Sequence, residues 1–160
     1  MSNSAEWTGD LAQRAKRIID SYAAVEGAAL PILHALQAEF GYIPEPVIPM
    51  IAEALNITRA EMHGIVTFYH DFRREPPGRH VLKLCRAEAC QSMGADALAE
   101  HARRRLGVAW GETSANGSTT LEPTYCLGLC ACAPSAMLDG RVIGRLNRER
   151  LDALLDEARS

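Results

Sequence analysis

The sequence has no long apolar run, and this absence excludes one broad class of protein. A helix needs about 20 consecutive apolar residues to cross a bilayer, and no segment of the 160 residues approaches that length. The first ten residues, Met1 to Asp10, also lack the basic and apolar regions of a signal peptide. We therefore expect no direct membrane insertion and a cytoplasmic location.

The sequence also lacks the features that bind nucleic acids, nucleotides or substrates. Its formal net charge of −3 and its pI near 5.9 leave no basic face for phosphate backbones. Neither G-x-G-x-x-G nor G-x-x-x-x-G-K-[ST], the glycine-rich loops that bind phosphates, is present. No Ser-His-Asp or paired-glutamate motif is evident, and the five histidines share no metal-ligand spacing. We expect no catalytic residue and no nucleic-acid partner.

Cysteine is scarce but clustered. Four of the five cysteines form two short motifs, Cys85-x4-Cys90 and Cys126-x3-Cys130. In a reducing compartment such clusters bind metal or take part in redox chemistry more often than they form stable disulfides. Small residues lie inside both motifs, Gly128 among them, and leave backbone N–H groups free to point at the sulfurs. The pattern predicts a [2Fe-2S] cluster held by all four thiolates, and hence an electron carrier.

Other interpretations of the cysteines stay open at this point. Four-cysteine zinc sites are common, although they favour C-x2-C spacing and both spacings here are wider. Four inert buried thiols and a redox dithiol are two further alternatives, but a dithiol of the thioredoxin type needs the missing C-x-x-C. Cys132 lies two residues after Cys130, so a ligand exchange between them is conceivable. Because four thiolates already complete the site, a spare thiol is the simpler interpretation of Cys132.

The first half of the chain has the apolar spacing of helices. Thr58 and Glu61 have the sequence of a capping box and predict the start of the last helix. Turn residues separate the helical segments, which favours a small antiparallel bundle. The predicted helices cover residues 11–25, 29–40, 47–55 and 59–72.

The pattern changes after the breaker Glu75-Pro-Pro-Gly78. Strands are predicted at residues 81–84, 119–125, 136–138 and 141–143, and helices at residues 95–106 and 148–159. Asp139-Gly140 predicts a hairpin turn, and Asn147 predicts the cap of the last helix. The order β-α-β-β-β-α is a thioredoxin-like layout. We expect an α+β protein, with a helical bundle in residues 1–74 and a thioredoxin-like α/β domain in residues 79–160.

Longer strings resemble the E subunit of NADH-quinone oxidoreductase. They are Leu30 to Pro44, Thr67-Phe-Tyr69 with Phe72, Pro77-Gly78, both cysteine motifs, and Ala133-Pro134. The resemblance runs from the region of Ala28 to the C-terminus. It implies a helical N-terminal region and a thioredoxin-like [2Fe-2S] ferredoxin in which the ligands are Cys85, Cys90, Cys126 and Cys130. It also implies docking on a larger flavin subunit that binds FMN and NAD(H), with a contribution from the N-terminal helices.

Within this family, three strings most resemble the gamma subunit of NAD-dependent molybdenum formate dehydrogenase. They are Val66 to Arg73, Leu84 to Gln91, and Cys126 to Cys132. This resemblance implies a non-catalytic redox subunit whose partners also include a larger catalytic subunit carrying a molybdenum cofactor and iron–sulfur clusters. The equivalent subunit of respiratory complex I or of an NAD-reducing hydrogenase is the first alternative. A zinc-binding adaptor and a free-standing ferredoxin are the others.

Overall fold

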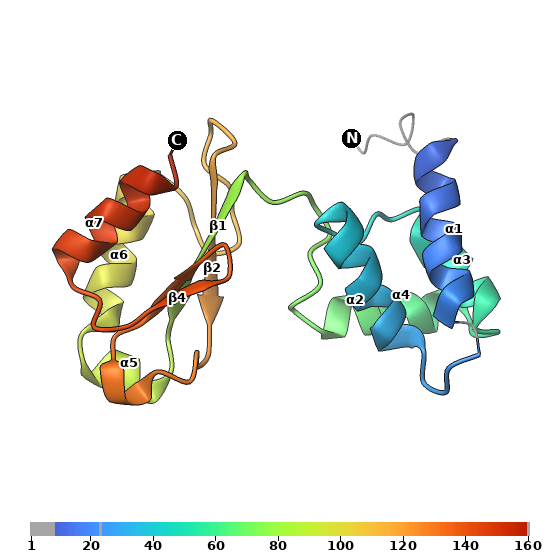
Figure 1. The fold of residues 1–160 in the computed structure, drawn as a ribbon, viewed down its shortest axis with the longest axis horizontal. Helices are drawn as coiled ribbons and strands as arrows, with labels where there is room; N and C mark the ends of the chain where they lie inside the picture. The colour runs from blue at the N-terminus through green and yellow to red at the C-terminus, as the bar shows by residue number, and fades with distance from the viewer. Residues whose placement is uncertain (1–8, 23, 160) are drawn as a thin grey trace. The chain divides into compact units, whose positions relative to one another are not determined.

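The computed structural model describes residues 9–22 and 24–159, and the chain divides into two compact units between Pro76 and Pro77. Among its described residues, the first unit contains only helices as regular secondary structure, whereas the second unit combines helices with a sheet (Figure 1). This composition confirms the predicted α+β class. Across the described residues, no helix combines the length and the apolar character that crossing a membrane demands.

The helical unit is built around one apolar core. Its helices are α1 (Asp10–Tyr22), α2 (Ala29–Phe40), α3 (Val47–Ala54) and α4 (Arg59–Phe68). Ile32 and Leu36 of α2 are fully buried, together with Ile51 of α3 and Met62 of α4. These positions follow the three- and four-residue spacing from which the helices were predicted. Burial of one apolar stripe on each helix therefore stabilises this unit.

The first helix ends earlier than predicted. We predicted a helix as far as Val25, but α1 ends at Tyr22, and Ala23 lies outside the described residues. Gly27 has a φ of 69°, in the left-handed region that glycine adopts at little cost, and it lies in the connection to α2.

The last helix of this unit also ends before its predicted limit. The spacing predicted helix as far as Phe72, whereas α4 ends at Phe68. The Gln37 side chain explains this early end, because its Nε2 donates to the carbonyl of Asp71 (2.8 Å) and its Oε1 accepts from the N–H of Arg73 (2.7 Å). These bonds replace helical ones and fold the segment back, so that Phe72 is buried.

Two helix starts follow their sequence signals. The Thr58 N–H donates to Glu61 Oε2 (2.8 Å), and the Glu61 N–H donates to Thr58 Oγ1 (3.1 Å), which completes the capping box of α4. In the second unit the Asn147 side chain accepts from the N–H of Arg150 at 2.9 Å and caps α7. Both caps are confirmed.

The second unit has a four-stranded mixed sheet. Its strands are β1 (His80–Cys85), β2 (Thr119–Thr124), β3 (Ala136–Leu138) and β4 (Arg141–Ile143). The spatial order is β2-β1-β3-β4, with β1 parallel to β2 and the other neighbours antiparallel. The helices are α5 (Glu88–Ser92), α6 (Ala95–Leu106) and α7 (Arg148–Glu157), and a short 3-10 helix, η1, spans Cys130–Cys132. The sequence did not predict α5 and η1, since five and three residues are too few to show a helical period.

One face of the sheet carries the core of this unit. Leu82 of β1 and Leu121 of β2 are fully buried with Leu151 and Leu155 of α7. Figure 1 shows α6 and α7 packed together against the sheet. Because side chains alternate along a strand, Lys83 belongs to the other face, where it forms an ion pair with Glu122 at 3.2 Å. The same alternation sends the Cys85 side chain away from the leucine core.

An ion-pair network joins α6 to α7. His101 Nε2 lies 2.6 Å from Asp152 Oδ1, and the Arg105 guanidinium contacts both Asp152 and Asp156. The pKa of Asp152 is lowered, mainly by the hydrogen bond with His101 and further by Arg105, although desolvation opposes the shift. The folded state therefore stabilises the ionised form of Asp152.

We expect the substitution Asp152→Asn to lower Tm at pH 5 to 7, and the loss to shrink in acid. A depressed folded-state pKa contributes stability above the unfolded-state value of about 3.9 and loses it as pH falls through the folded-state value. Thermal unfolding followed by circular dichroism across the acidic range measures this difference. Asp156→Asn, which removes the more exposed partner of Arg105, is the control and should cost less. A difference in Tm that does not change with pH would contradict the assignment.

Candidate metal centre

The first two cysteines lie at the end of β1 and in the helix that follows it. Cys85 is the last residue of β1, and Cys90 lies within α5. The Cys90 N–H donates to the carbonyl of Ala87 at 2.9 Å, which turns the chain back toward the strand end. Only 2% of Cys85 and 1% of Cys90 is exposed to solvent. We call these two residues the inner pair.

Cys126 and Cys130 come from the loop after β2, and we call them the outer pair. Both are exposed, and their Sγ atoms lie 3.7 Å apart. Two sulfurs bound tetrahedrally to one metal, with bonds of about 2.3 Å, would lie about 3.8 Å apart. Cys126 has a φ of 106°, and Gly128 has a φ of 75°. This bent backbone lets the Gly128 N–H donate to Cys126 Sγ at 3.4 Å.

Several hydrogen-bond donors converge on the sulfur of Cys85. Burial on its own would raise the pKa of this thiol, but hydrogen bonds from the backbone amides of Ala87 and Cys126 and from the side chains of Cys90 and Ser135 lower it overall. An N–H group of the outer pair thus favours the thiolate form of Cys85. The N–H groups supply the partial positive charge that a metal-bound thiolate needs.

The pKa of the Cys130 thiol shifts in the opposite direction to that of Cys85. Its pKa is raised, chiefly by the hydrogen bond and charge it shares with Cys126, and further by burial and the nearby charges of Cys90 and Cys85. The charges of Cys126, Cys90 and Cys85 all act on the Cys130 thiol, which therefore favours its neutral, protonated form. Positive metal ions would instead favour the thiolate.

Two pairs of cysteines suit a binuclear centre, with one pair for each iron. Within residues 9–22 and 24–159, no three His, Cys, Asp or Glu side chains are grouped so that they could hold one metal ion.

Cys132 lies half-buried at the end of η1. Its carbonyl accepts a hydrogen bond from the N–H of Arg145 at 2.5 Å, which ties η1 to the segment after β4. A Cβ on Gly144 would lie only 2.8 Å from the Cβ of Cys132, so the two backbones approach closely. Sequence reasoning missed Gly144, since an isolated glycine twelve residues from Cys132 carries no motif.

Ser135 is the second residue that sequence reasoning missed. Its hydroxyl is buried, and Oγ lies 3.6 Å from Cys90 Sγ. A single serine between Pro134 and β3 belongs to no recognised ligand pattern. Its position one residue after Ala133-Pro134, beside the second cysteine motif, is the only signal that could have drawn attention to it.

A mixed sheet covered by helices, with paired cysteines where β1 and β2 end, defines a thiolate-ligated iron–sulfur protein of thioredoxin-like fold. The family model for the thioredoxin-like [2Fe-2S] ferredoxins matches residues 15–159. The chain belongs to this family. The prediction of a [2Fe-2S] cofactor in an electron-transfer protein is thereby confirmed.

The similar proteins include subunits of NADH-dependent enzymes. The chain is 38% identical to the NADH-quinone oxidoreductase E 2 subunit of Rhizobium meliloti (strain 1021) over 133 residues, which are 83% of this chain and 79% of the relative. It is 33% identical to the NADH-quinone oxidoreductase E subunit of Escherichia coli (strain K12) over 129 residues, which are 81% and 78% of the two chains. The predicted resemblance to this E subunit is confirmed.

A similar solved structure belongs to a hydrogenase. The NAD+-reducing [NiFe]-hydrogenase in its air-oxidized state has a chain that matches with a TM-score of 0.69 and 25% identity. The match covers 82% of this chain but only 23% of the hydrogenase chain. The chain is therefore a [2Fe-2S] electron-transfer protein of the kind found in NADH-dependent oxidoreductases.

Proposed function

We propose that this chain is the [2Fe-2S] electron-transfer subunit of a cytoplasmic NAD-dependent formate dehydrogenase. The observation that carries the proposal is the string Cys126-Leu-Gly-Leu-Cys-Ala-Cys132, in which a fifth cysteine follows the second motif. This string, together with Val66 to Arg73 and Leu84 to Gln91, most resembles the gamma subunit of molybdenum formate dehydrogenase.

In this proposal the four cysteines of the inner and outer pairs hold the cluster. When bound, a [2Fe-2S] cluster accepts and releases one electron at a time. Cys85 and Cys90 would anchor it below the surface, where burial excludes water. Cys126 and Cys130 are exposed, and they would present the other edge to a partner protein. The N–H groups that contact the sulfurs would stabilise the added negative charge of the reduced state.

The proposed partners are a flavin subunit that binds FMN and NAD(H) and a larger molybdenum-containing catalytic subunit. We assign docking on the flavin subunit to residues 1–74. Support comes from Phe68 and Tyr69 at the end of α4, which are 73% and 42% exposed. Their rings lie 5.1 Å apart in an edge-to-face arrangement. Adjacent exposed aromatic rings are typical of interaction sites in proteins.

We expect Phe68→Ser to weaken association with the flavin subunit without unfolding the chain. Burial of a Phe side chain contributes about 1.5–3 kcal/mol, so its loss should weaken binding by about tenfold or more. Titration of the purified chain against the flavin subunit measures the change. Val25→Ser is the control, because Val25 is another exposed apolar residue of the same unit. Equal weakening by both variants would remove Phe68 from the proposed interface.

The equivalent subunit of respiratory complex I or of an NAD-reducing hydrogenase is the second candidate. It is favoured by the names of the relatives, which are NADH-quinone oxidoreductase subunits, and by the hydrogenase structure. The chain's own residues would act in the same way in any of the three enzymes, because each couples a flavin to one-electron carriers.

The test is to tag the chain in its native host, purify the complex under mild conditions, and assay NAD+ reduction with formate while measuring molybdenum and iron. Formate-dependent NADH formation with molybdenum present supports the proposal. NADH oxidation without formate activity would assign the chain to the second candidate. Zinc without iron would overturn both. A tagged chain carrying Cys85→Ser and Cys90→Ser is the control for electron transfer through this subunit.

A further inference from the structure

We propose that the Ser135 hydroxyl donates a hydrogen bond to the Cys90 thiolate of the inner pair and thereby raises the reduction potential of the cluster. The inference rests on the proposed ligand role of Cys85 and Cys90. A residue outside the cysteine motifs would then help to set the reduction potential of the cluster.

The geometry brings the hydroxyl to the sulfur of Cys90. Ser135 is 2% exposed, and its Oγ lies 3.6 Å from Cys90 Sγ, within the range of hydrogen bonds to sulfur. A hydroxyl at this depth needs a hydrogen-bond partner, and Cys90 Sγ is in position to be that partner.

The backbone holds Ser135 in this position. The Cys85 N–H donates to the Ser135 carbonyl at 3.0 Å, so serine and cysteine are joined across neighbouring strands. On the other side of Ser135, the carbonyl of Pro134 accepts from the N–H of Leu146 at 2.9 Å. Because both carbonyls are bonded, the backbone of Ser135 is held beside the inner pair.

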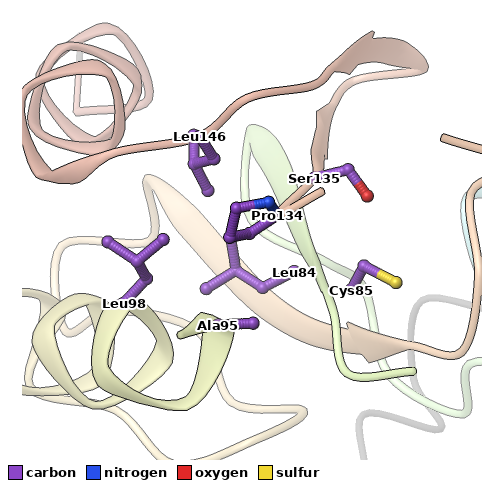
Figure 2. A pocket seen from close by; sticks show the side chains of 7 residues that line it. All are labelled: Leu84, Cys85, Ala95, Leu98, Pro134, Ser135 and Leu146. Carbon is purple, nitrogen blue, oxygen red and sulfur yellow. The ribbon is translucent and has the colours of Figure 1, made fainter. Parts of the chain in front are cut away.

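The leucine side of Ser135 is tightly packed. Figure 2 shows Cys85 and Ser135 pointing to the same side, whereas Leu84 points toward Leu98 on the other side. The space among these residues and Leu146 has no room for a water molecule.

The chemistry of the ligands decides the direction of the hydrogen bond. In the free thiols either sulfur or oxygen can donate. A thiol bound to iron has lost its proton and can only accept, so the serine must be the donor once the cluster is held. A donated hydrogen bond stabilises negative charge on sulfur, and the reduced cluster carries one more negative charge than the oxidised cluster. Ser135 should therefore favour the reduced state.

The test compares the full-length chain and the variant Ser135→Ala, each reconstituted with iron and sulfide. We expect the variant to keep its cluster at a lower midpoint potential. It should also lose one exchangeable proton coupled to the reduced cluster in electron–nuclear double resonance spectra recorded in H2O and D2O. Ser135→Thr keeps the hydroxyl and should restore both properties. Should the alanine variant bind no cluster, Ser135→Gly provides the same comparison.

The matched control is Ser118→Ala. Ser118 is also a fully buried serine, but it precedes β2 at the end of the sheet away from the cysteines. Its removal should lower stability and leave the potential unchanged. An unchanged potential and proton coupling in Ser135→Ala would overturn the inference alone. A wild-type chain that takes up no iron would overturn the proposed ligand set, which separates the two failures.

Discussion

Replacing Cys126 by serine is expected to abolish or distort the [2Fe-2S] signal of this chain. The Cys126 sulfur lies 3.7 Å from that of Cys130, so the substitution removes one of the two adjacent thiolates of the outer pair. Loss of residues that merely support metal ligands costs about 10–100-fold in affinity, and loss of a ligand should cost more. Iron and sulfide content and the spectrum of the reduced chain by electron paramagnetic resonance measure the effect.

Cys132→Ser is the matched control for this experiment. Cys132 lies on the same loop and is half-buried, so both variants make the same chemical change in nearly the same place. We expect its cluster content and spectrum to match those of the wild type. A normal spectrum in Cys126→Ser would contradict the ligand assignment. Cluster loss in Cys132→Ser would indicate that Cys132 rather than Cys130 is the fourth ligand.

Gly144→Ala is expected to displace the outer loop and lower cluster occupancy. The added Cβ would lie 2.8 Å from the Cβ of Cys132 and 3.0 Å from its carbonyl oxygen. The backbone has little freedom to retreat, because Arg150 Nη1 donates to the Gly144 carbonyl at 2.7 Å and the Arg145 N–H bonds to Cys132. Overpacking of this kind costs about 1–3 kcal/mol. The strain falls on η1, which contains Cys130.

Denaturant unfolding and iron content would measure the effect of Gly144→Ala. Gly64→Ala is the control: Gly64 lies in the exposed part of α4, and a Cβ there would meet no atom within 4 Å. Because alanine is the better helix former, that variant should gain about 0.5–1 kcal/mol. If Gly144→Ala kept the stability and iron content of the wild type, the prediction would be contradicted. The loop would then accommodate the added Cβ without a loss of folding free energy.

Local sequence patterns predicted most of the secondary structure. The helix at Ala29–Phe40 and the hairpin strands Ala136–Leu138 and Arg141–Ile143 have the bounds expected from apolar spacing and turn residues. The end of α4 was predicted wrongly, because the groups that stop it belong to Gln37, 34 residues before Asp71. No pattern within α4 contains that information.

The cysteine motifs predict a set of four sulfur donors, but they carry no information on how deeply each sulfur is buried. Spacing alone suggested that four thiolates share one site, and the structure places all four within electrostatic reach of one another. The difference between a buried inner pair and an exposed outer pair follows from where α5 and η1 pack, and both helices are too short to predict.

The amino-acid sequence by itself therefore determined the order of the elements, the caps of α4 and α7, and the four thiols, since each depends on residues only a few positions apart. The tertiary structure alone decided which sulfurs are buried and which other groups touch them. Ser135 reaches Cys90 across 45 residues of chain, and Gly144 meets Cys132 only because the segment after β4 returns to η1. Contacts of this kind arise when distant strands pair, which no local pattern records.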